Sequence, residues 1–320
     1  MKIFLAGATG AIGRALLPQL VAHGHQVTGM TRNTAKQDLL RSLGARPVVA
    51  DALDADAVAR VVASAEPEVI IHELTALSGK LSIRDARHPE RSALAIMTNR
   101  LRTESTDHLL AAGRAVGVRR FVVQSFAAFR WARTGGPVLT EDDPIDPDPP
   151  AALRVPLIGL LRTEGAVSGI EWAEGLVLRY GGFYGPGTAI SNAPDAPMAT
   201  LVRKRRFPIV GDGAGVWSHI HIDDAAAATV AALDHGEPGI YNIVDDEPAP
   251  VRDWLPVLAS ALGAKPPRRI PRWLARLAAG ETATLMMTEA KGSSNTKAKQ
   301  QLRWRPRYPS WREGFRQGLG

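Results

Sequence analysis

The sequence predicts an α/β fold: a Rossmann-like, doubly wound parallel sheet with a smaller C-terminal lobe. Two observations predict it. Through the first 180 residues, short and almost continuously apolar runs alternate with helix-length segments, which is the pattern of βαβ units whose strands are covered on both faces. A glycine-rich turn follows the first apolar run directly. With 320 residues, 45% of them hydrophobic, the chain is long enough to bury the core that such a sheet needs.

The elements of this sheet follow one another in a regular order. The strands are expected at Lys2–Ala6, Gln26–Met30, Arg46–Val49, Val69–His72, Arg120–Gln124 and Leu176–Arg179. The helices are expected at Ile12–His23, Thr34–Leu43, Ala55–Ser64, Ala93–Val116 and Ala152–Ser168. Because crossovers between parallel strands are right-handed, the loops after the strands lie along one edge of the sheet, where folds of this class bind ligands.

The turn after the first strand has the glycine spacing of a dinucleotide-binding motif. Its glycines permit a tight turn, let the backbone approach a pyrophosphate, and let the helix pack on the strand. The N-terminus of that helix offers N–H groups to the phosphates. A purely structural βα turn is the alternative, but the strand–turn–helix context is the one that the motif requires. The residues expected to contact the cofactor are Gly7, Thr9, Gly10, Ala11, Ile12 and Gly13.

The end of the second strand bears on the choice between the two nicotinamide cofactors. An NAD-selective site carries an acidic side chain here for the ribose hydroxyls, and none is present. Arg32 stands there instead and is able to pair with the 2′-phosphate of NADP, although a surface arginine is the alternative. We therefore predict NADP(H) in preference to NAD(H).

The alternation of strands and helices ends with the sixth predicted strand. We therefore predict a dinucleotide-binding domain over residues 1–180, with residues 216–245 returning to its sheet. Residues 181–215 and 246–320 are predicted to form the substrate-binding lobe.

Composition excludes several classes of site and partner. The chain has no cysteine, which excludes disulfides and thiolate sites and fits a cytoplasmic location. No His/Asp/Glu cluster has metal-ligand spacing, so no metal is expected. No apolar stretch approaches the roughly 18 residues of a membrane span, so no membrane partner is expected. The net charge of +7 comes without a nucleic-acid motif and is interpreted as a solvated or structural basic face.

Several further motifs resemble those of the extended short-chain dehydrogenase/reductases, the NAD-dependent epimerase/dehydratase family. Beside the glycine turn, they are Asp51, Asn99, Leu178-Arg179-Tyr180, Tyr184-Gly185-Pro186-Gly187, His221-Ile222-Asp223-Asp224 and Leu302-x-Trp304-x-Pro306. The resemblance covers nearly the whole chain, and it is the combination of motifs that is specific. It implies further cofactor contacts at Asp51, Ala52, Leu74, Thr75, Ala76, Gln124, Tyr180 and Gly181. It also implies a homodimer formed through the helices at residues 93–116 and 152–168.

Two of these positions carry specific expectations. Asp51 is expected to bond the adenine amino group, and a helix cap is the alternative reading of this residue. Tyr180 is expected near the nicotinamide. Both expectations come from the resemblance.

The catalytic pattern of the family is missing. Redox members use a Tyr-x-x-x-Lys pair with a Ser or Thr, and this chain has no Tyr-x-x-x-Lys. Pro156 falls at the tyrosine position, Leu160 at the lysine position and Phe126 at the serine position. Ser125 and Tyr184 remain as candidate catalytic hydrogen-bond donors.

The substrate side departs from the nucleotide-sugar members as well. Where those members often hold a diphosphate with an asparagine and an arginine, this chain has Gly182 and Trp217. We expect a small, neutral, apolar or aromatic substrate, because a bulky ring replaces a cationic clamp. The residues expected to line its site are Phe126, Phe129, Tyr184 and Trp217.

Three functions are compatible with this pattern. The first is an NADP(H)-dependent oxidoreductase that acts on a carbonyl or hydroxyl with non-standard catalytic residues. The second is a lyase, isomerase or cyclase without net redox chemistry, which the loss of the Tyr/Lys pair favours. The third is a catalytically silent, dinucleotide-binding regulatory protein. The first is preferred.

Overall fold

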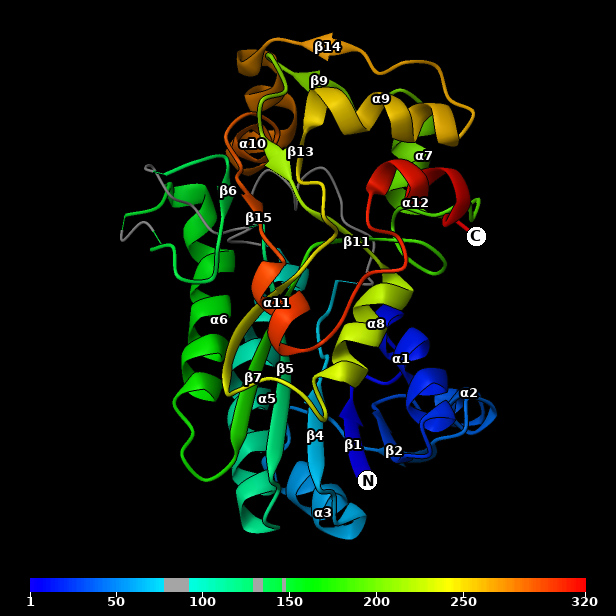
Figure 1. Cartoon of the computed structure of the whole chain (residues 1–320), viewed down its shortest axis with the longest axis vertical. Helices are drawn as coiled ribbons and strands as arrows, with labels where there is room; N and C mark the ends of the chain where they lie inside the picture. The colour runs from blue at the N-terminus through cyan, green and yellow to red at the C-terminus, as the bar shows by residue number, and fades with distance from the viewer. Residues whose placement is uncertain (78–91, 129–134, 146–147) are drawn as a thin grey trace.

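A seven-stranded parallel sheet forms the centre of the computed structural model, which describes residues 1–77, 92–128, 135–145 and 148–320 (Figure 1). The order of its strands is β12-β7-β5-β4-β1-β2-β3. Their bounds are β1 Lys2–Ala6, β2 Gln26–Thr31, β3 Arg46–Val49, β4 Val69–His72, β5 Arg120–Phe126, β7 Glu174–Tyr180 and β12 Gly239–Ile243. This arrangement confirms the predicted α/β fold.

Helices cover both faces of the sheet (Figure 1). On one face α1 packs against α8, and on the other α5 packs against both α3 and α6. Their bounds are α1 Ala11–Ala22, α3 Ala55–Ala65, α5 Ala93–Ala115, α6 Ala151–Ser168 and α8 Ile222–Ala231. Each face therefore has its own apolar core, and the nearly continuous hydrophobicity of the strands is explained.

Two predicted elements differ from the observed ones in an informative way. The helix expected at residues 34–43 is a short 3-10 turn, η1 (Thr34–Lys36), followed by α2 (Gln37–Ser42). The side chain of Asn33 accepts a hydrogen bond from the backbone N–H of Ala35 and so starts the turn locally. Strand β5 extends to Phe126, because β7 pairs with it up to Tyr180.

The remaining elements form a smaller lobe beside the carboxyl ends of the strands. They are β8 Gly182–Tyr184, α7 Pro197–Arg203, β9 Ile209–Val210, β10 Val216–Trp217, β11 His219–His221, β13 Ala249–Pro250, α9 Val251–Ala261, β14 Arg269–Ile270, α10 Arg272–Thr288 and α12 Trp311–Gln317. The short strands β6 (Val138–Leu139) and β15 (Gly292–Ser293) pair with each other. The core of the lobe contains the fully buried Trp254, Trp311 and Phe315.

The C-terminal part of the chain does not stay within the lobe. Helix α11 (Thr296–Gln301) lies against β12, and Ala298, Leu302 and Trp304 pack in the same core as the sheet and α1. The sequence pattern placed these residues in the substrate-binding lobe. The domain division itself stays a prediction.

The strand order creates the ligand site of the fold. Strand β1 lies between β2 and β4, and the chain leaves β1 toward β2 and later enters the other half of the sheet at β4. The carboxyl ends of β1 and β4 therefore flank a topological switch point, which is where open α/β sheets bind their ligands. The glycine turn follows β1 at this point. In the described ranges, no helix is long and apolar enough to cross a membrane.

Candidate functional site

The glycine turn between β1 and α1 has the shape that a pyrophosphate requires. Gly7 has φ +93°, and a Cβ there would lie 2.6 Å from the carbonyl carbon and oxygen of Glu73. A Cβ at Gly13 would overlap the carbonyl oxygen of Gly7. Gly10 is the N-cap of α1, and no side chain caps the helix. The turn therefore leaves uncapped N–H groups beside a backbone surface that only glycines permit, which fits a dinucleotide phosphate.

The ends of β2 and β3 place the two residues expected at the adenosine half of the cofactor. Arg32 follows β2, is exposed, and makes no ion pair with any described residue. Asp51 is exposed, and its carboxylate accepts a hydrogen bond from the N–H of Leu53 at 3.0 Å. The residue that caps α3 is Asp54, which accepts from the N–H of Ala57. The helix-cap alternative for Asp51 therefore does not hold.

The other residues that the resemblance assigns to the cofactor follow β3, β4 and β7 or, in the case of Gln124, lie near the end of β5. Leu74, Thr75 and Ala76 are half-buried directly after β4. The amide of Gln124 is partly buried, and its nitrogen has no hydrogen bond among the described residues. The other two, Ala52 and Gly181, are buried.

A buried carboxyl group lies directly beside the glycine turn. Glu73 is 3% exposed, and burial raises its pKa to about 8. The hydroxyl of Tyr180 donates to Glu73 Oε1 at 2.9 Å and is 2.6 Å from the hydroxyl of Thr229 on α8. Glu73 Oε2 has no hydrogen-bond partner among the described residues. Burial also raises the pKa of Tyr180, so at neutral pH this network is uncharged.

Ser125 belongs to a second buried network, between β5, β7 and α6. Its hydroxyl donates to Glu164 Oε1 at 2.6 Å. Arg179 binds the same carboxylate in a bidentate manner, at 2.8 and 2.6 Å. The side chains of Arg179 and Glu164 are 4% and 7% exposed. The hydroxyl of Ser125, a predicted catalytic donor, therefore donates its hydrogen bond to the carboxylate of a buried ion pair.

Tyr184, the other predicted catalytic donor, lies inside the lobe. It is fully buried, and its ring packs edge-on against His221 and Phe315, at centroid distances of 5.2 Å each. Its hydroxyl faces the backbone of Gly314 and has no hydrogen-bond partner in the described part of the chain. Burial raises its pKa, so the phenol is a weak acid here. The reason for this difference from our expectation is that β8 pairs with β11, which turns the ring into the core.

Trp217 is half-buried at the edge of an aromatic cluster. Its indole N–H donates to the carbonyl of Met286 at 2.7 Å, and its ring lies 5.0 Å from that of Trp254. His219 lies in the same cluster, 4.9 Å from Trp254; burial lowers its pKa to about 3, and neither ring nitrogen has a partner among the described residues. Trp254 and His219 are fully buried in the core of the lobe, whereas Trp217 is partly exposed at the edge of the cluster. The role of Trp217 in substrate binding stays a prediction. Phe126 is half-buried at the end of β5, and Phe129 lies outside the described residues.

The positions to which the family resemblance assigns the Tyr/Lys pair are apolar in the structure. Pro156 and Leu160 lie in α6, where Leu160 is 3% exposed. A Cβ at Gly159 would meet the side chain of Asn99, which donates to the carbonyl of Val155 at 2.8 Å. Helix α6 is therefore packed tightly on α5 here without a proton-donating side chain at either position.

Sequence reasoning did not identify the buried Glu73 network as a feature of the site. The one indication of this network in the sequence is that Glu73, a charged residue, directly follows the apolar run 69–71 and His72. His72 is buried, with one ring nitrogen 3.1 Å from Thr106 Oγ1 and the other accepting from the N–H of Leu74. Its pKa is lowered by burial to about 4, in keeping with a structural role.

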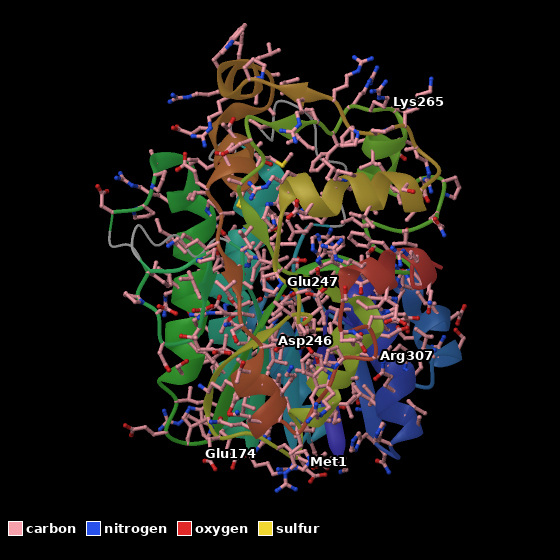
Figure 2. All side chains as sticks on the ribbon, turned by 45° about the horizontal axis from the view of Figure 1, so that its top comes forward. Met1, Glu174, Asp246, Glu247, Lys265 and Arg307 are labelled. Atoms are coloured by element: carbon pink, nitrogen blue, oxygen red, sulfur yellow. The ribbon has the colours of Figure 1, made fainter. Side chains whose placement is uncertain are left out.

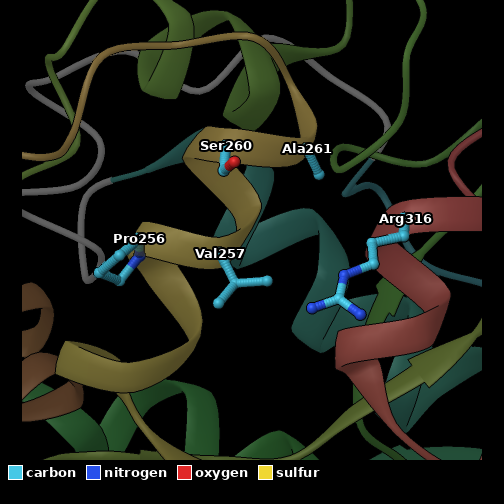
Figure 3. Close-up of a pocket in the computed structure, with 5 residues that line it drawn as sticks. All are labelled: Pro256, Val257, Ser260, Ala261 and Arg316. Atoms are coloured by element: carbon cyan, nitrogen blue, oxygen red, sulfur yellow. The ribbon is translucent and has the colours of Figure 1, made fainter.

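The surface of the smaller lobe is hollowed between two helices. A hollow of about 470 Å³ between α9 and α12 is lined by Pro256, Val257, Ser260, Ala261 and Arg316 (Figure 3). Arg316 is the charged side chain of this lining, so the hollow offers no acid–base pair. Within the described ranges, no group of three or more His, Asp or Glu side chains is arranged to hold a metal ion.

Comparison with known families agrees with this geometry. Residues 7–142 match the NAD(P)H-binding family, and residues 162–244 match the NAD-dependent epimerase/dehydratase family. A 3-diazoavenalumate denitrifying reductase from a Streptomyces species is 44% identical over 98% of this chain and 99% of its own length. The chain belongs to the NAD-dependent epimerase/dehydratase family. As a member of this family, it is an NAD(P)-dependent oxidoreductase.

Two further similar proteins are more distant than the Streptomyces reductase. A 2-alkyl-3-oxoalkanoate reductase from Stenotrophomonas maltophilia is 29% identical over 82% of this chain and 76% of its own length. Among solved structures, the UDP-glucose 4-epimerase of Thermotoga maritima has a TM-score of 0.75 at 22% identity, over 100% of this chain and 97% of that one. At this identity the structural match shows a shared fold.

Proposed function

We propose that this protein is an NADPH-dependent reductase of a small aromatic or apolar diazo compound, from which it removes the two nitrogens as N2. The observation that carries the proposal is the replacement of the family's proton-donating groups by Phe126, Pro156 and Leu160. The name of the Streptomyces relative, a denitrifying reductase of a diazo compound, supports the same reaction class.

The proposed reaction does not need the missing groups. When bound, the reduced nicotinamide supplies a hydride, which is a hydrogen with both of its electrons. A diazo compound that has taken up its proton from solution is a diazonium ion, and replacing the diazonium group by hydrogen consumes one hydride and no further proton. The C–N bond breaks, its electron pair leaves with N2, and carbon gains the hydride. Reduction of a ketone, by contrast, also places a proton on oxygen, which is the task of the Tyr/Lys pair in redox relatives. A site without that pair suits the first reaction.

The residues of this chain would then act by binding and by excluding water. The glycine turn and Arg32 would hold the cofactor, with the guanidinium on the 2′-phosphate. Phe126 and Trp217 would form apolar walls for the substrate. The two hydroxyls expected from the sequence to be catalytic donors, those of Ser125 and Tyr184, are not needed as proton donors in this reaction.

Reduction of a carbonyl group is the second candidate. The Stenotrophomonas relative is named for such a reduction, and the sequence pattern favours a carbonyl or hydroxyl substrate. This candidate requires a proton donor other than the family tyrosine.

The deciding experiment incubates the purified protein with NADPH and 3-diazoavenalumate, and separately with a 2-alkyl-3-oxoalkanoate. We expect NADPH oxidation at 340 nm together with one N2 per NADPH for the diazo compound. With NADPH deuterated at the transferred position, deuterium is expected on the carbon that loses nitrogen. A reaction without protein measures the spontaneous background. Turnover of the ketone alone, or product without deuterium, would overturn the diazo proposal.

Replacing Arg32 with alanine is expected to weaken NADPH binding by about tenfold or more, because a charge-assisted pair with the 2′-phosphate is lost. NADH binding is expected to stay within about twofold, since NADH has no 2′-phosphate. Calorimetric titration of both proteins with both cofactors measures this. Arg41→Ala, at an exposed site in α2, is the matched control. A wild-type preference for NADH would contradict the assignment.

We also propose a homodimer through α5 and α6. Three apolar side chains on these helices are exposed: Ile96 is 47%, Ile158 is 65% and Leu161 is 39% exposed. Light scattering that gives the mass of a single chain would refute the dimer.

A further inference from the structure

The end of the smaller lobe carries an exposed apolar stripe at the start of α10. Trp273 and Leu277, one helical turn apart, are 68% and 67% exposed, and Leu274 beside them is 37% exposed. Figure 1 shows this part of α10 at the end of the molecule opposite the N-terminus. The outward face of a surface helix is normally polar, so a tryptophan and two leucines there indicate a contact surface.

A break in α10 separates this stripe from the rest of the helix. Gly280 has φ 88° and ψ 175°, which are not helical values, so residues 272–279 form a short segment of their own. Ala275 of this segment is 2% exposed and faces inward. Beyond the break, the carbonyl of Met286 accepts the hydrogen bond from Trp217. The segment that carries the stripe is therefore separate from the part of α10 that contacts Trp217.

The positive charge of the protein is concentrated around the stripe. Residues 203–212 and 265–281 contain nine Lys and Arg residues and two acidic residues, a net charge of +7 that equals that of the whole chain. Parallel pairing of β9 with β14 brings the two segments together, with Ile209 opposite Arg269. Arg205 also donates to the carbonyl of Pro266 at 3.1 Å.

Much of this charge has no acidic partner. Arg272 pairs with Glu289 at 3.2 Å, and Arg276 pairs with Glu281 at 3.1 Å. Across the described parts of the chain, several exposed cations of the two segments form no ion pair: Lys204, Arg206, Lys265, Arg268 and Arg269. Figure 2 shows Lys265 at this end of the molecule, far from Met1. These cations are available to a negatively charged surface.

We propose that this end of the lobe binds the surface of an anionic lipid bilayer, with Trp273 and its neighbouring leucines inserted among the headgroups. A short helix with an apolar face and flanking arginines is the recognition chemistry for such a surface. A nucleic acid would pair with the exposed cations but would leave the leucines exposed to water. A neutral bilayer would bury the leucines but would offer no negative charge to the cations. The sequence predicts no membrane partner because no segment spans a bilayer, but surface binding requires no span.

The test uses the full-length protein and sedimentation with two kinds of vesicle, phosphatidylcholine alone and phosphatidylcholine mixed with phosphatidylglycerol. We expect binding to the mixed vesicles, weakened by added salt, and little binding to phosphatidylcholine alone. Trp273→Ala and the double variant Arg268→Glu/Arg269→Glu are each expected to lower the affinity for mixed vesicles by about tenfold or more. Thermal unfolding confirms that each variant is folded.

A charge-matched control is available at the opposite end of the molecule. Arg60 in α3 and Arg114 in α5 are exposed, and Arg60→Glu/Arg114→Glu removes the same net charge. This control is expected to bind mixed vesicles nearly as well as the wild type. Equal losses in the control and in Arg268→Glu/Arg269→Glu would overturn the proposal, as would binding to neither vesicle. Tighter binding to duplex DNA, or a dimer that Trp273→Ala dissociates, would assign the face to another partner and also overturn it.

Discussion

Replacing Glu164 with alanine is expected to lower the free energy of unfolding by about 3–5 kcal/mol, the typical cost of removing one partner of a buried ion pair. Glu164 holds Arg179 in a bidentate pair in which the two side chains are only 7% and 4% exposed. Its loss leaves the guanidinium buried without a counter-charge. It also removes the acceptor of the Ser125 hydroxyl. Urea unfolding monitored by circular dichroism measures the change.

Two further variants separate the ion pair from general damage to α6. Arg162 lies on the same helix as Glu164, and Arg162→Ala breaks its exposed pair with Asp107 of α5; little effect is expected, because surface pairs contribute little. The double variant Glu164→Leu/Arg179→Met removes both charges and is expected to be more stable than Glu164→Ala. A Glu164→Ala protein as stable as the wild type would contradict the prediction.

Glu73 is expected to make the protein less stable as the pH rises. The pKa of its carboxyl group rises from the ordinary value of 4.5 to about 8 in the folded protein, so between these values the unfolded chain has released a proton that the folded protein retains. Stability falls with pH where the folded state binds more protons. The loss is up to about 1.4 kcal/mol per pH unit across this window and then levels off.

Glu73→Gln removes this dependence while keeping an acceptor for Tyr180. We expect the variant to gain stability over the wild type progressively from about pH 5 to about pH 8, by about 3 kcal/mol at neutral pH. Urea unfolding of both proteins at each pH measures the difference. His72 and His219, which are buried and neutral, weaken both proteins equally in acid, so they cancel in the comparison. A constant difference across this range would show that Glu73 does not titrate between the two values.

The alternating strands and helices of the sheet were predictable, because their hydrophobic pattern in the sequence agrees with their burial in the structure. Strands β1, β3 and β4 have the predicted bounds; β1 and β4 are short apolar runs buried within the sheet, and β3 is a partly exposed strand at its edge. The glycine turn was predictable for a similar reason: its spacing reflects close backbone contacts at Gly7 and Gly13 that exclude any side chain. Such information is local and is carried by a few consecutive residues.

The polar interior was less accessible to sequence reasoning. Tyr180, the partner of Glu73, comes from β7, more than a hundred residues later, and Thr229, the partner of Tyr180, comes from α8. No local pattern connects these residues. Tyr184 was expected to line the substrate site and to donate a hydrogen bond there. Its position is decided instead by the pairing of β8 with β11, which is a tertiary event. The cofactor, catalytic and substrate roles of individual residues stay predictions.

The return of the chain to the sheet has a consequence for folding during synthesis. Leu302 and Trp304 complete an apolar core that begins with Ile3. This core therefore joins residues about three hundred positions apart in the sequence. Helices α1 and α8 lie on that face and are made earlier, but the ribosome must release almost the entire chain before α11 covers the part of the face at β12. Until then an apolar surface is open to solvent and to other nascent chains. A chaperone that shields this face until α11 arrives would therefore increase the yield of native protein more than it changes the stability of the finished molecule.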